Sequence, residues 1–186
     1  MTENAALVVF GVTWSLLILM AVVAQVMSFA ERTKRQAGLI TNLLIIVSFT
    51  LVLGLFYLGR WFGTYAGSPA ARLAGAVLAA FGVGLYVAAH LYLRRNWSIA
   101  AAIVEGHRLV VAGPYRYVRH PMYTAMMLIV IGSGLLVSSY AILASIVPVA
   151  AAYYVRARRE EAMLLAEFPE YRDYAARTRM FVPGVL

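Results

Sequence analysis

The sequence predicts an all-α integral membrane protein with five transmembrane helices, and three observations lead to this fold class. Of its 186 residues, 63% are hydrophobic and 13% are charged, and the mean hydropathy is +0.79. Soluble domains carry about 25% charged residues. The apolar residues gather in five segments, and Lys and Arg concentrate in the regions that separate alternate segments. We therefore expect one membrane domain over residues 1–186, without a Rossmann domain.

The five apolar segments approach or exceed the length that crosses about 30 Å of hydrocarbon. We expect helices over residues 5–30, 38–58, 71–93, 121–137 and 140–155. The first two would form an N-terminal helical hairpin within residues 1–70. The first segment lacks the basic start and clear cleavage site of a signal peptide. Ser138-Ser139 leaves room for only a very short turn, so the last two helices should form an antiparallel hairpin.

The distribution of Lys and Arg along the chain predicts the orientation of these spans. Residues 31–36 contain three, residues 94–119 contain five and residues 156–179 contain six, which is fourteen of the sixteen in the chain. Five spans would place these three regions on one face of the membrane. The positive-inside rule then puts the N-terminus outside and the C-terminus in the cytoplasm. The formal charge of +8 is thus explained by topology, and we expect no nucleic-acid partner.

Several residue types exclude or weaken other kinds of site. The chain has no cysteine, which excludes disulfides, thiolate nucleophiles and cysteine-ligated zinc. Its three histidines are spread apart, so we expect no metal. For His107 the alternatives are a residue that faces a ligand and a solvated loop residue. For His90 they are a functional residue within the membrane and a side chain that reaches the membrane interface. Gly82-Val83-Gly84 lies inside an apolar helix with no preceding strand, which favours close helix packing over dinucleotide binding.

The stretch 107–123 is polar, basic and aromatic beyond what a linker requires. Pro121 is compatible with the first turn of a helix, so a helix should begin there, with His120 at its cap. The N–H groups of that turn, beside Arg119, could seat a carboxylate or phosphate of a cofactor. The alternative is a helix start next to a lipid phosphate. The sequence at 113–115 predicts a turn that folds the loop back.

Residues 156–179 mix charges with apolar side chains at helical intervals. This pattern predicts an amphipathic cytoplasmic helix, broken near Pro169. The helix could lie on the membrane surface or fold over the 94–120 loop. The i, i+4 spacing of Arg156 and Glu160 favours the second placement. This pair could orient a substrate and hold a cofactor, or it could be an ordinary surface ion pair.

A series of short motifs occurs in a fixed order in the second half of the chain. They are Asn96-Trp97-Ser98, Gly106-His107-Arg108-Leu109-Val110, Gly113-Pro114-Tyr115, Arg119-His120-Pro121-Met122-Tyr123, residues 156–161 and Glu167-Phe168-Pro169-Glu170-Tyr171. In order and spacing they resemble the isoprenylcysteine carboxyl methyltransferase family, in its compact prokaryotic form. The resemblance covers residues 94–182, which would be the catalytic, cofactor-binding region. Pro169 departs from it, because relatives commonly have a glycine and one more residue there.

This resemblance implies a membrane enzyme that uses S-adenosylmethionine. Carried over by position, the cofactor-binding residues are His107, Arg108, Leu109, Val110, Tyr115, His120, Pro121, Met122, Tyr123 and Glu160. Arg156 corresponds to a catalytic, substrate-binding arginine. Local chemistry agrees, because the helix start at Pro121 suits the methionine carboxylate and Glu160 suits the amino group or ribose hydroxyls. Tyr115 or Tyr123 suits the sulfonium or the adenine.

The expected reaction is carboxyl O-methylation of a prenylcysteine-like or other lipidic substrate, which enters from the bilayer. A carboxylate attacks the methyl group in line without a general base, and Arg156 positions it. Three alternatives remain: a phospholipid or small-molecule N- or O-methyltransferase, a non-catalytic scaffold or transport accessory, and an NADPH-dependent membrane reductase. The sequence leaves the acceptor and the oligomeric state open.

Overall fold

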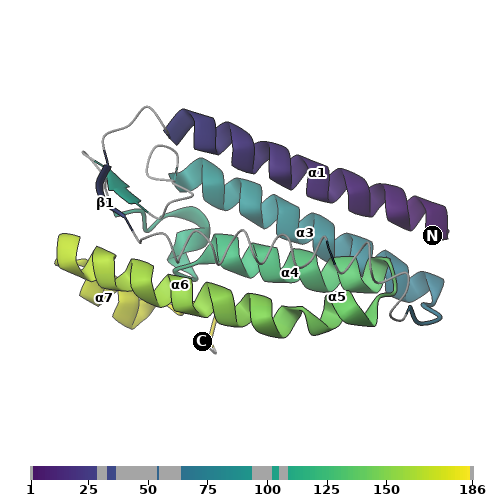
Figure 1. Cartoon of the computed structure of the whole chain (residues 1–186). Coiled ribbons are helices and arrows are strands. Elements are labelled where there is room, and N and C mark those ends of the chain that lie inside the picture. The colour runs from purple at the N-terminus through teal and green to yellow at the C-terminus, as the bar shows by residue number, and fades with distance from the viewer. Residues whose placement is uncertain are drawn as a thin grey trace.

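The structure, a computed structural model, describes residues 2–28, 33–36, 54, 64–93, 102–104 and 109–184. These residues are mostly helical (Figure 1). The elements are α1 Glu3–Ser28, β1 Thr33–Gln36, α3 Pro69–Leu93, β2 Ala102–Val104, the 3₁₀ helix η2 Gly113–Arg116, α4 Pro121–Leu136, α5 Tyr140–Ala144, α6 Ile146–Glu167 and α7 Tyr171–Arg177. Of the helix expected over residues 38–58, only Gly54 is among the described residues, and it is helical. The full count of five spans is therefore still a prediction.

The hairpin between α4 and α5 forms where the sequence predicted it. Helix α4 starts at Pro121, whose missing N–H is tolerated in a first turn, and ends at Leu136. Ser138 takes the left-handed conformation with φ of 55°, which reverses the chain within a short turn. Ser139 then caps α5, because its Oγ accepts a hydrogen bond from the N–H of Ile142 at 3.3 Å.

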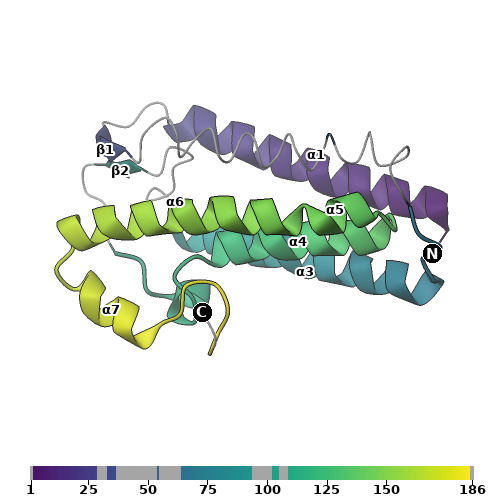
Figure 2. The same cartoon turned by 60° about the horizontal axis from the view of Figure 1, so that its bottom comes forward.

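Helices α5 and α6 continue one another with an interruption at Ser145. Pro148 lacks an N–H, and its ring would clash with the carbonyl of Ala144 in a regular helix, which explains the interruption. Helix α6 ends at Glu167 and α7 starts at Tyr171, so the break predicted near Pro169 is confirmed. Figure 2 shows α7 folded back beside the charged end of α6.

Helices α3 and α4 pack closely because glycines face each other across their contact. A Cβ on Gly75 would lie 2.5 Å from the backbone N of Leu136 and 2.7 Å from the carbonyl of Gly132. A Cβ on Gly82 would lie 2.7 Å from Ile129. The packing role predicted for Gly82 is therefore confirmed, whereas Gly84 faces open space. Small residues let the two backbones approach.

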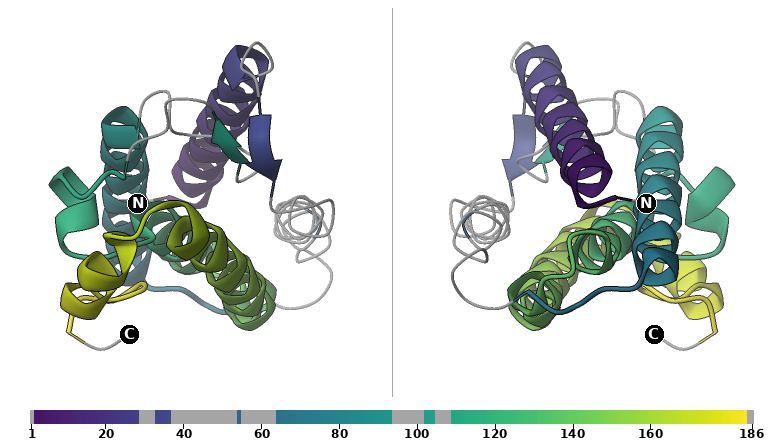
Figure 3. Two further views of the ribbon diagram at one scale, coloured as in Figure 1. Left: turned by 90° about the vertical axis from the view of Figure 1, so that its left-hand side faces the viewer. Right: turned by 90° about the vertical axis from the view of Figure 1, so that its right-hand side faces the viewer.

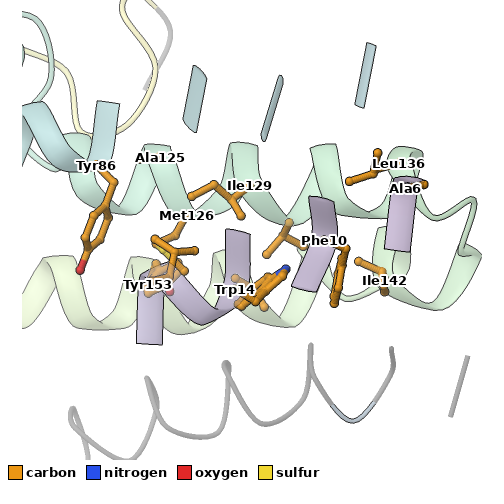
Figure 4. Packing of buried hydrophobic residues seen from close by; sticks show 13 residues of the cluster. Ala6, Phe10, Trp14, Tyr86, Ala125, Met126, Ile129, Leu136, Ile142 and Tyr153 are labelled. Atoms are coloured by element: carbon orange, nitrogen blue, oxygen red, sulfur yellow. The ribbon is translucent and has the colours of Figure 1, made fainter. Parts of the chain in front are cut away.

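Helix α1 joins this pair through a buried polar contact and an apolar cluster. The indole Nε1 of Trp14 donates a hydrogen bond to Ser133 Oγ at 3.1 Å. Figure 4 shows Phe10 and Trp14 of α1 meeting residues of α4 and α6, with Tyr86 and Tyr153 toward one end of the cluster and Ile142 toward the other. Seen from its ends, the bundle has η2 and α7 on the outside of α3 and α6 (Figure 3).

The outer faces of the bundle are apolar. On α3, Leu73, Val77 and Phe81 recur every four residues and are each more than half exposed, while the buried face carries small residues. Two helical stretches of the described residues, Pro69–Leu93 and Tyr140–Glu167, are long and apolar enough to cross a membrane, and α4 is a shorter apolar helix. Large apolar side chains turned outward are expected where lipid is the solvent.

One element was not predicted. Strands β1 and β2 form a two-stranded antiparallel ribbon, in which Thr33 pairs with Val104 and Gln36 with Ala102. The expected fold was helical throughout, and both segments were assigned to loops. Their pairing satisfies backbone N–H and C=O groups that a loop would leave to water. The ribbon also joins two loops far apart in sequence at one end of the bundle (Figure 1).

Candidate functional site

The start of α4 and the facing side of α6 bring four of the predicted site residues together. His120 is the residue before α4, and its carbonyl accepts hydrogen bonds from the N–H groups of Tyr123 and Thr124, both at 3.1 Å. Arg156 and Glu160 lie one turn apart on the facing side of α6. The contacts between His120, Tyr123, Arg156 and Glu160 form what we call the charged cluster.

Tyr123 connects Arg156 and Glu160 of α6. Arg156 Nε donates to the Tyr123 hydroxyl at 2.6 Å and to Glu160 Oε1 at 2.9 Å. The same hydroxyl donates to Glu160 Oε1 at 2.5 Å. Arg156 is only 2% exposed, so the reading of this pair as an ordinary surface ion pair is wrong. A buried guanidinium beside a carboxylate needs such hydrogen bonds, because burial removes the water that otherwise solvates each charge.

His120 lies between two neighbouring carboxylates. Its Nδ1 is 3.5 Å from Glu160 Oε2, and its Nε2 is 3.4 Å from Glu161 Oε1. Burial alone lowers the pKa of His120, but the two carboxylates outweigh burial and raise this pKa above the ordinary value. The carboxylate near each ring nitrogen thus stabilises the imidazolium form relative to that of a solvated histidine.

Aromatic rings fix the orientation of the cluster. The ring of Tyr123 is nearly parallel to that of His120, with centroids 5.4 Å apart, and to that of Tyr153, with centroids 4.9 Å apart. Phe181 approaches His120 with centroids 6.0 Å apart in a tilted arrangement. Since Tyr153 belongs to the apolar core, the core holds the Tyr123 ring in place. Sequence reasoning missed Tyr153 because its spacing is that of any core residue.

A second network ties the C-terminal segment to the cluster. Arg119 Nε is 2.6 Å from Glu161 Oε1, and its Nη1 donates to the carbonyls of Ala175 and Thr178 at 3.0 and 2.5 Å. Arg119 was predicted to face an external anion, and its partner here is a carboxylate of the chain itself. The proximity of Glu161 to both Arg119 and His120 was not predicted, although its place next to Glu160 could have suggested it.

Residues 179–181 cross the beginning of α4 as a strap. The N–H of Arg119 donates to the carbonyl of Arg179 at 2.8 Å, and the N–H of His120 donates to that of Met180 at 3.0 Å. Thr124 Oγ1 donates to the carbonyl of Phe181 at 2.7 Å. The side chains of Met180 and Phe181 are buried against Ala157 and the Tyr123 region. The chain after α7 therefore covers one side of the charged cluster.

Tyr115 lies beside this strap in η2. The turn predicted here forms because Gly113 adopts φ of 59° against the ring of Tyr92, where a Cβ would lie 2.5 Å away. The carbonyl of Tyr115 accepts a hydrogen bond from the Tyr174 hydroxyl at 2.7 Å. Its own hydroxyl is buried and has no hydrogen-bond partner among the residues described. Burial, reinforced by the charge of Glu160, raises the pKa of Tyr115 well above the ordinary value.

The remaining predicted site residues among those the structure describes are apolar, and their side chains make no hydrogen bond to the charged cluster. Leu109 and Val110 are half-buried on the approach to η2. Pro121 is buried, and Met122 is half-buried against the apolar core. His107 and Arg108 lie outside the described residues. His90, the other histidine considered, is half-buried near the end of α3.

The fold and the site define a class of protein. It is a helical integral membrane protein with apolar side chains on the outer faces of its helices and a largely buried charged cluster at one end of the bundle. The model of one protein family, described as phospholipid methyltransferase, matches residues 70–170, which include α3 after its first residue, all of α4 and α6, and every member of the cluster. The chain belongs to this family.

Two curated relatives are metal-resistance proteins. The chain is 33% identical over 143 residues to the cobalt-zinc-cadmium resistance protein CzcN of Cupriavidus metallidurans. The aligned region covers 75% of this chain and 61% of that protein. It is 37% identical over 94 residues to the nickel-cobalt-cadmium resistance protein NccN of Alcaligenes xylosoxydans xylosoxydans. Here the aligned region covers 48% of this chain and 43% of that protein. The chain thus spans less than two thirds of either relative.

A solved structure shares the fold. It is that of the eukaryotic intramembrane Ras methyltransferase ICMT, isoprenylcysteine carboxyl methyltransferase, with a TM-score of 0.52 and 23% identity. The similarity covers 77% of this chain and 52% of that one. Together with the matched family, it confirms the resemblance inferred from the motifs of residues 94–182.

Proposed function

We propose that this chain is an integral membrane methyltransferase that transfers a methyl group from S-adenosylmethionine to a lipophilic acceptor bearing a carboxylate. The observation that carries the proposal is the hydrogen-bonded Arg156–Tyr123–Glu160 arrangement, found inside the region that matches a methyltransferase family. A nicotinamide reductase or a non-catalytic scaffold, both compatible with the sequence, gains no support from that family.

The residues near the charged cluster fit the cofactor. Glu160 keeps 18% of its side chain exposed, so its carboxylate can accept hydrogen bonds from an incoming ammonium or ribose. The buried Tyr115 hydroxyl without a partner among the described residues is a second group for a polar ligand. By resemblance, His107, Arg108, Leu109, Val110, His120, Pro121, Met122 and Tyr123 complete the cofactor site.

The protein's contribution to the reaction is positioning. When bound, S-adenosylmethionine supplies a methyl group that is already electrophilic. A carboxylate acceptor needs no general base, because it is ionised at neutral pH. Arg156, held by Tyr123 and Glu160, attracts and orients that carboxylate, and the near-complete burial of its guanidinium limits competition from water. The apolar helices on either side give the lipophilic part of the acceptor a route from the bilayer.

A second candidate acceptor is the amine of a phospholipid. The matched family is described as phospholipid methyltransferase, and this description favours a phospholipid substrate. The two candidates differ in charge at the reacting atom. Methyl transfer to prenylcysteine analogues, compared with methyl transfer to phosphatidylethanolamine, distinguishes them. The distinction concerns the acceptor alone, since both use the same cofactor.

The proposed arrangement in the membrane is that predicted from the sequence. Residues 1–70 contribute an N-terminal hairpin, five helices span the bilayer, and the N-terminus is outside with the C-terminus in the cytoplasm. The pairing of β1 with β2 supports a common face for the loops 31–36 and 94–119. The position of α7 at the same end of the bundle supports adding residues 156–179 to that face (Figure 1). Residues 94–182 would then form the catalytic region.

The deciding experiment is calorimetric titration of detergent-purified protein with S-adenosylhomocysteine. We expect saturable binding in the wild type and at least tenfold weaker binding in Glu160→Gln. Glu170→Gln, an exposed carboxylate outside the cluster, is the matched control and should bind like the wild type. A folded wild type that binds neither S-adenosylhomocysteine nor S-adenosylmethionine, with or without lipid acceptors, would refute the proposal.

A further inference from the structure

A cavity of about 290 Å³ lies at the end of the bundle opposite the charged cluster. It is bounded by the first turns of α1 and α3, the segment 64–66 and the turn between α4 and α5. Figure 4 shows the two ends of the apolar core, with Leu136 and Ile142, which line the cavity, far along the cluster from Tyr86 and Tyr153. We propose that this cavity binds the headgroup of a zwitterionic phospholipid, with the phosphate on Arg72 and the amine beside Glu3.

Arg72 supplies the positive charge of the cavity. Its Nε donates to Ser138 Oγ at 3.4 Å, which fixes the guanidinium at the wall. Arg72 occupies the first turn of α3, where the positive end of the helix dipole disfavours a cation. It is also one of only two basic residues outside the three Lys- and Arg-rich regions. A phosphate bound in the cavity would offset the unfavourable interaction of Arg72 with the helix dipole.

Backbone hydrogen bonds tie together the wall that holds Arg72. Thr64 pairs with Ser139 in an antiparallel bridge, and the N–H of Tyr65 donates to the carbonyl of Ser138 at 2.9 Å. The backbone of Gly67 lies so close to Ser138 that any Cβ there would overlap the Ser138 hydroxyl. The guanidinium and the Ser138 hydroxyl are therefore presented in a defined geometry, as recognition of a phosphate requires.

The remaining lining selects the kind of headgroup. Glu3 places a carboxylate at the same cavity, which repels a purely anionic headgroup and attracts one that carries an amine. Ala6, Leu7, Leu136 and Ile142 provide an apolar wall for the glycerol and the start of the acyl chains. A volume near the lower end of the roughly 300–1,000 Å³ typical of ligand sites suits a headgroup.

This site is separate from the proposed methyl-transfer site. Arg72 and Tyr86 are fourteen residues apart on α3, which is ~21 Å along a helix. Tyr86 packs in the same apolar cluster as Tyr153, one turn before Arg156. A lipid bound at Arg72 would therefore lie near the opposite membrane surface from the charged cluster. It would hold α1 against α3 and α4 and would not enter the reaction.

Native mass spectrometry of the delipidated protein tests the proposal. The probes are short-chain phosphatidylethanolamine, short-chain phosphatidylglycerol and inorganic phosphate. We expect one equivalent of phosphatidylethanolamine to bind the wild type, with an affinity at least tenfold above that of phosphatidylglycerol. Inorganic phosphate should neither bind detectably nor displace the lipid. Arg72→Gln should weaken the lipid at least tenfold, and Glu3→Gln should remove the preference over phosphatidylglycerol.

Arg172→Gln is the matched control, because it removes one exposed arginine from α7. If Arg72→Gln does not fold, Arg72→Lys replaces it and should keep the preference for phosphatidylethanolamine. Equal lipid affinity in Arg72→Gln and Arg172→Gln would overturn the assignment of the phosphate. Equal affinity of the wild type for the two lipids would overturn the zwitterionic headgroup. Saturation by inorganic phosphate would show an anion site without lipid recognition.

Discussion

The hydroxyl of Tyr123 lies 2.6 Å from Nε of Arg156, and it donates at the same time to the carboxylate that the arginine contacts. One phenol thus holds a guanidinium and a carboxylate of neighbouring turns of α6 in a fixed arrangement. Tyr123 was predicted as a cofactor contact from the family resemblance. The geometry gives it the further role of a positioning residue for Arg156.

Tyr123→Phe removes this hydroxyl and leaves the ring in its stack. We expect turnover to fall about tenfold, which corresponds to about 1.4 kcal/mol of transition-state stabilisation. The affinity for S-adenosylhomocysteine should change less than threefold. Tyr117→Phe, at an exposed tyrosine in the segment before α4, is the control. Methyl transfer and calorimetric binding are measured side by side for the two variants. Equal turnover of Tyr123→Phe and Tyr117→Phe would contradict the positioning role of the Tyr123 hydroxyl.

Arg156→Lys keeps the charge and loses the planar guanidinium. Lysine cannot donate from the Nε position to both Tyr123 and Glu160, so a carboxylate acceptor would be held in a poorer orientation. We expect turnover to drop more than the cofactor affinity does. Steady-state kinetics with calorimetry separates the two effects. Turnover equal to that of the wild type would count against a substrate role for Arg156.

Glu161→Gln should loosen the C-terminal segment. The substitution removes the charge that pairs with Arg119 at 2.6 Å, where both side chains are largely buried. Loss of a hydrogen bond between charged groups lowers the free energy of unfolding by about 1.5–3 kcal/mol. We expect a lower Tm and faster proteolysis after residue 170. The exposed Glu170→Gln serves as the reference, and identical melting of the two variants would argue against the network.

The raised pKa of His120 makes stability depend on pH. The folded protein binds the imidazole proton of His120 more tightly than the unfolded chain, in which the pKa of histidine is about 6.5. The resulting stabilisation is fully present below that value and is lost as the pH rises through the higher pKa of the folded state. Tm should therefore decrease from pH 6 to pH 9, and His120→Asn should flatten this decrease. An unchanged slope in the variant would exclude His120 as the source.

Gly75→Ala should separate α3 from α4, because its new Cβ would meet the backbone of Leu136 and Gly132. Overpacking of this kind lowers the free energy of unfolding by about 1–3 kcal/mol. Gly84→Ala lies on the same helix and meets nothing within 4 Å, so it should leave stability unchanged or raise it slightly. Unfolding of both variants in one detergent provides the comparison. A Gly75→Ala protein as stable as Gly84→Ala would be inconsistent with the close packing.

The helix boundaries were largely predictable because they depend on local chemistry. Pro121 starts α4, the break after Glu167 falls next to Pro169, and Ser138 reverses the chain, as the sequence indicated. The ribbon of β1 and β2 was missed, because neither segment has a strong strand pattern of its own. Its pairing depends on two loops meeting at one end of the bundle, which local sequence does not specify.

By itself, the sequence determined the helical class, the apolar helices that face lipid, the family motifs and the spacing that puts Arg156 and Glu160 on one face of α6. These features follow from composition and from the helical period, which act over a few residues. Only the tertiary structure decided that Tyr123 joins this pair, that Glu161 takes Arg119, and that residues 179–181 cross the start of α4. Such contacts join residues far apart in the chain, and they form because buried charges and backbone groups must find partners once the helices have excluded water.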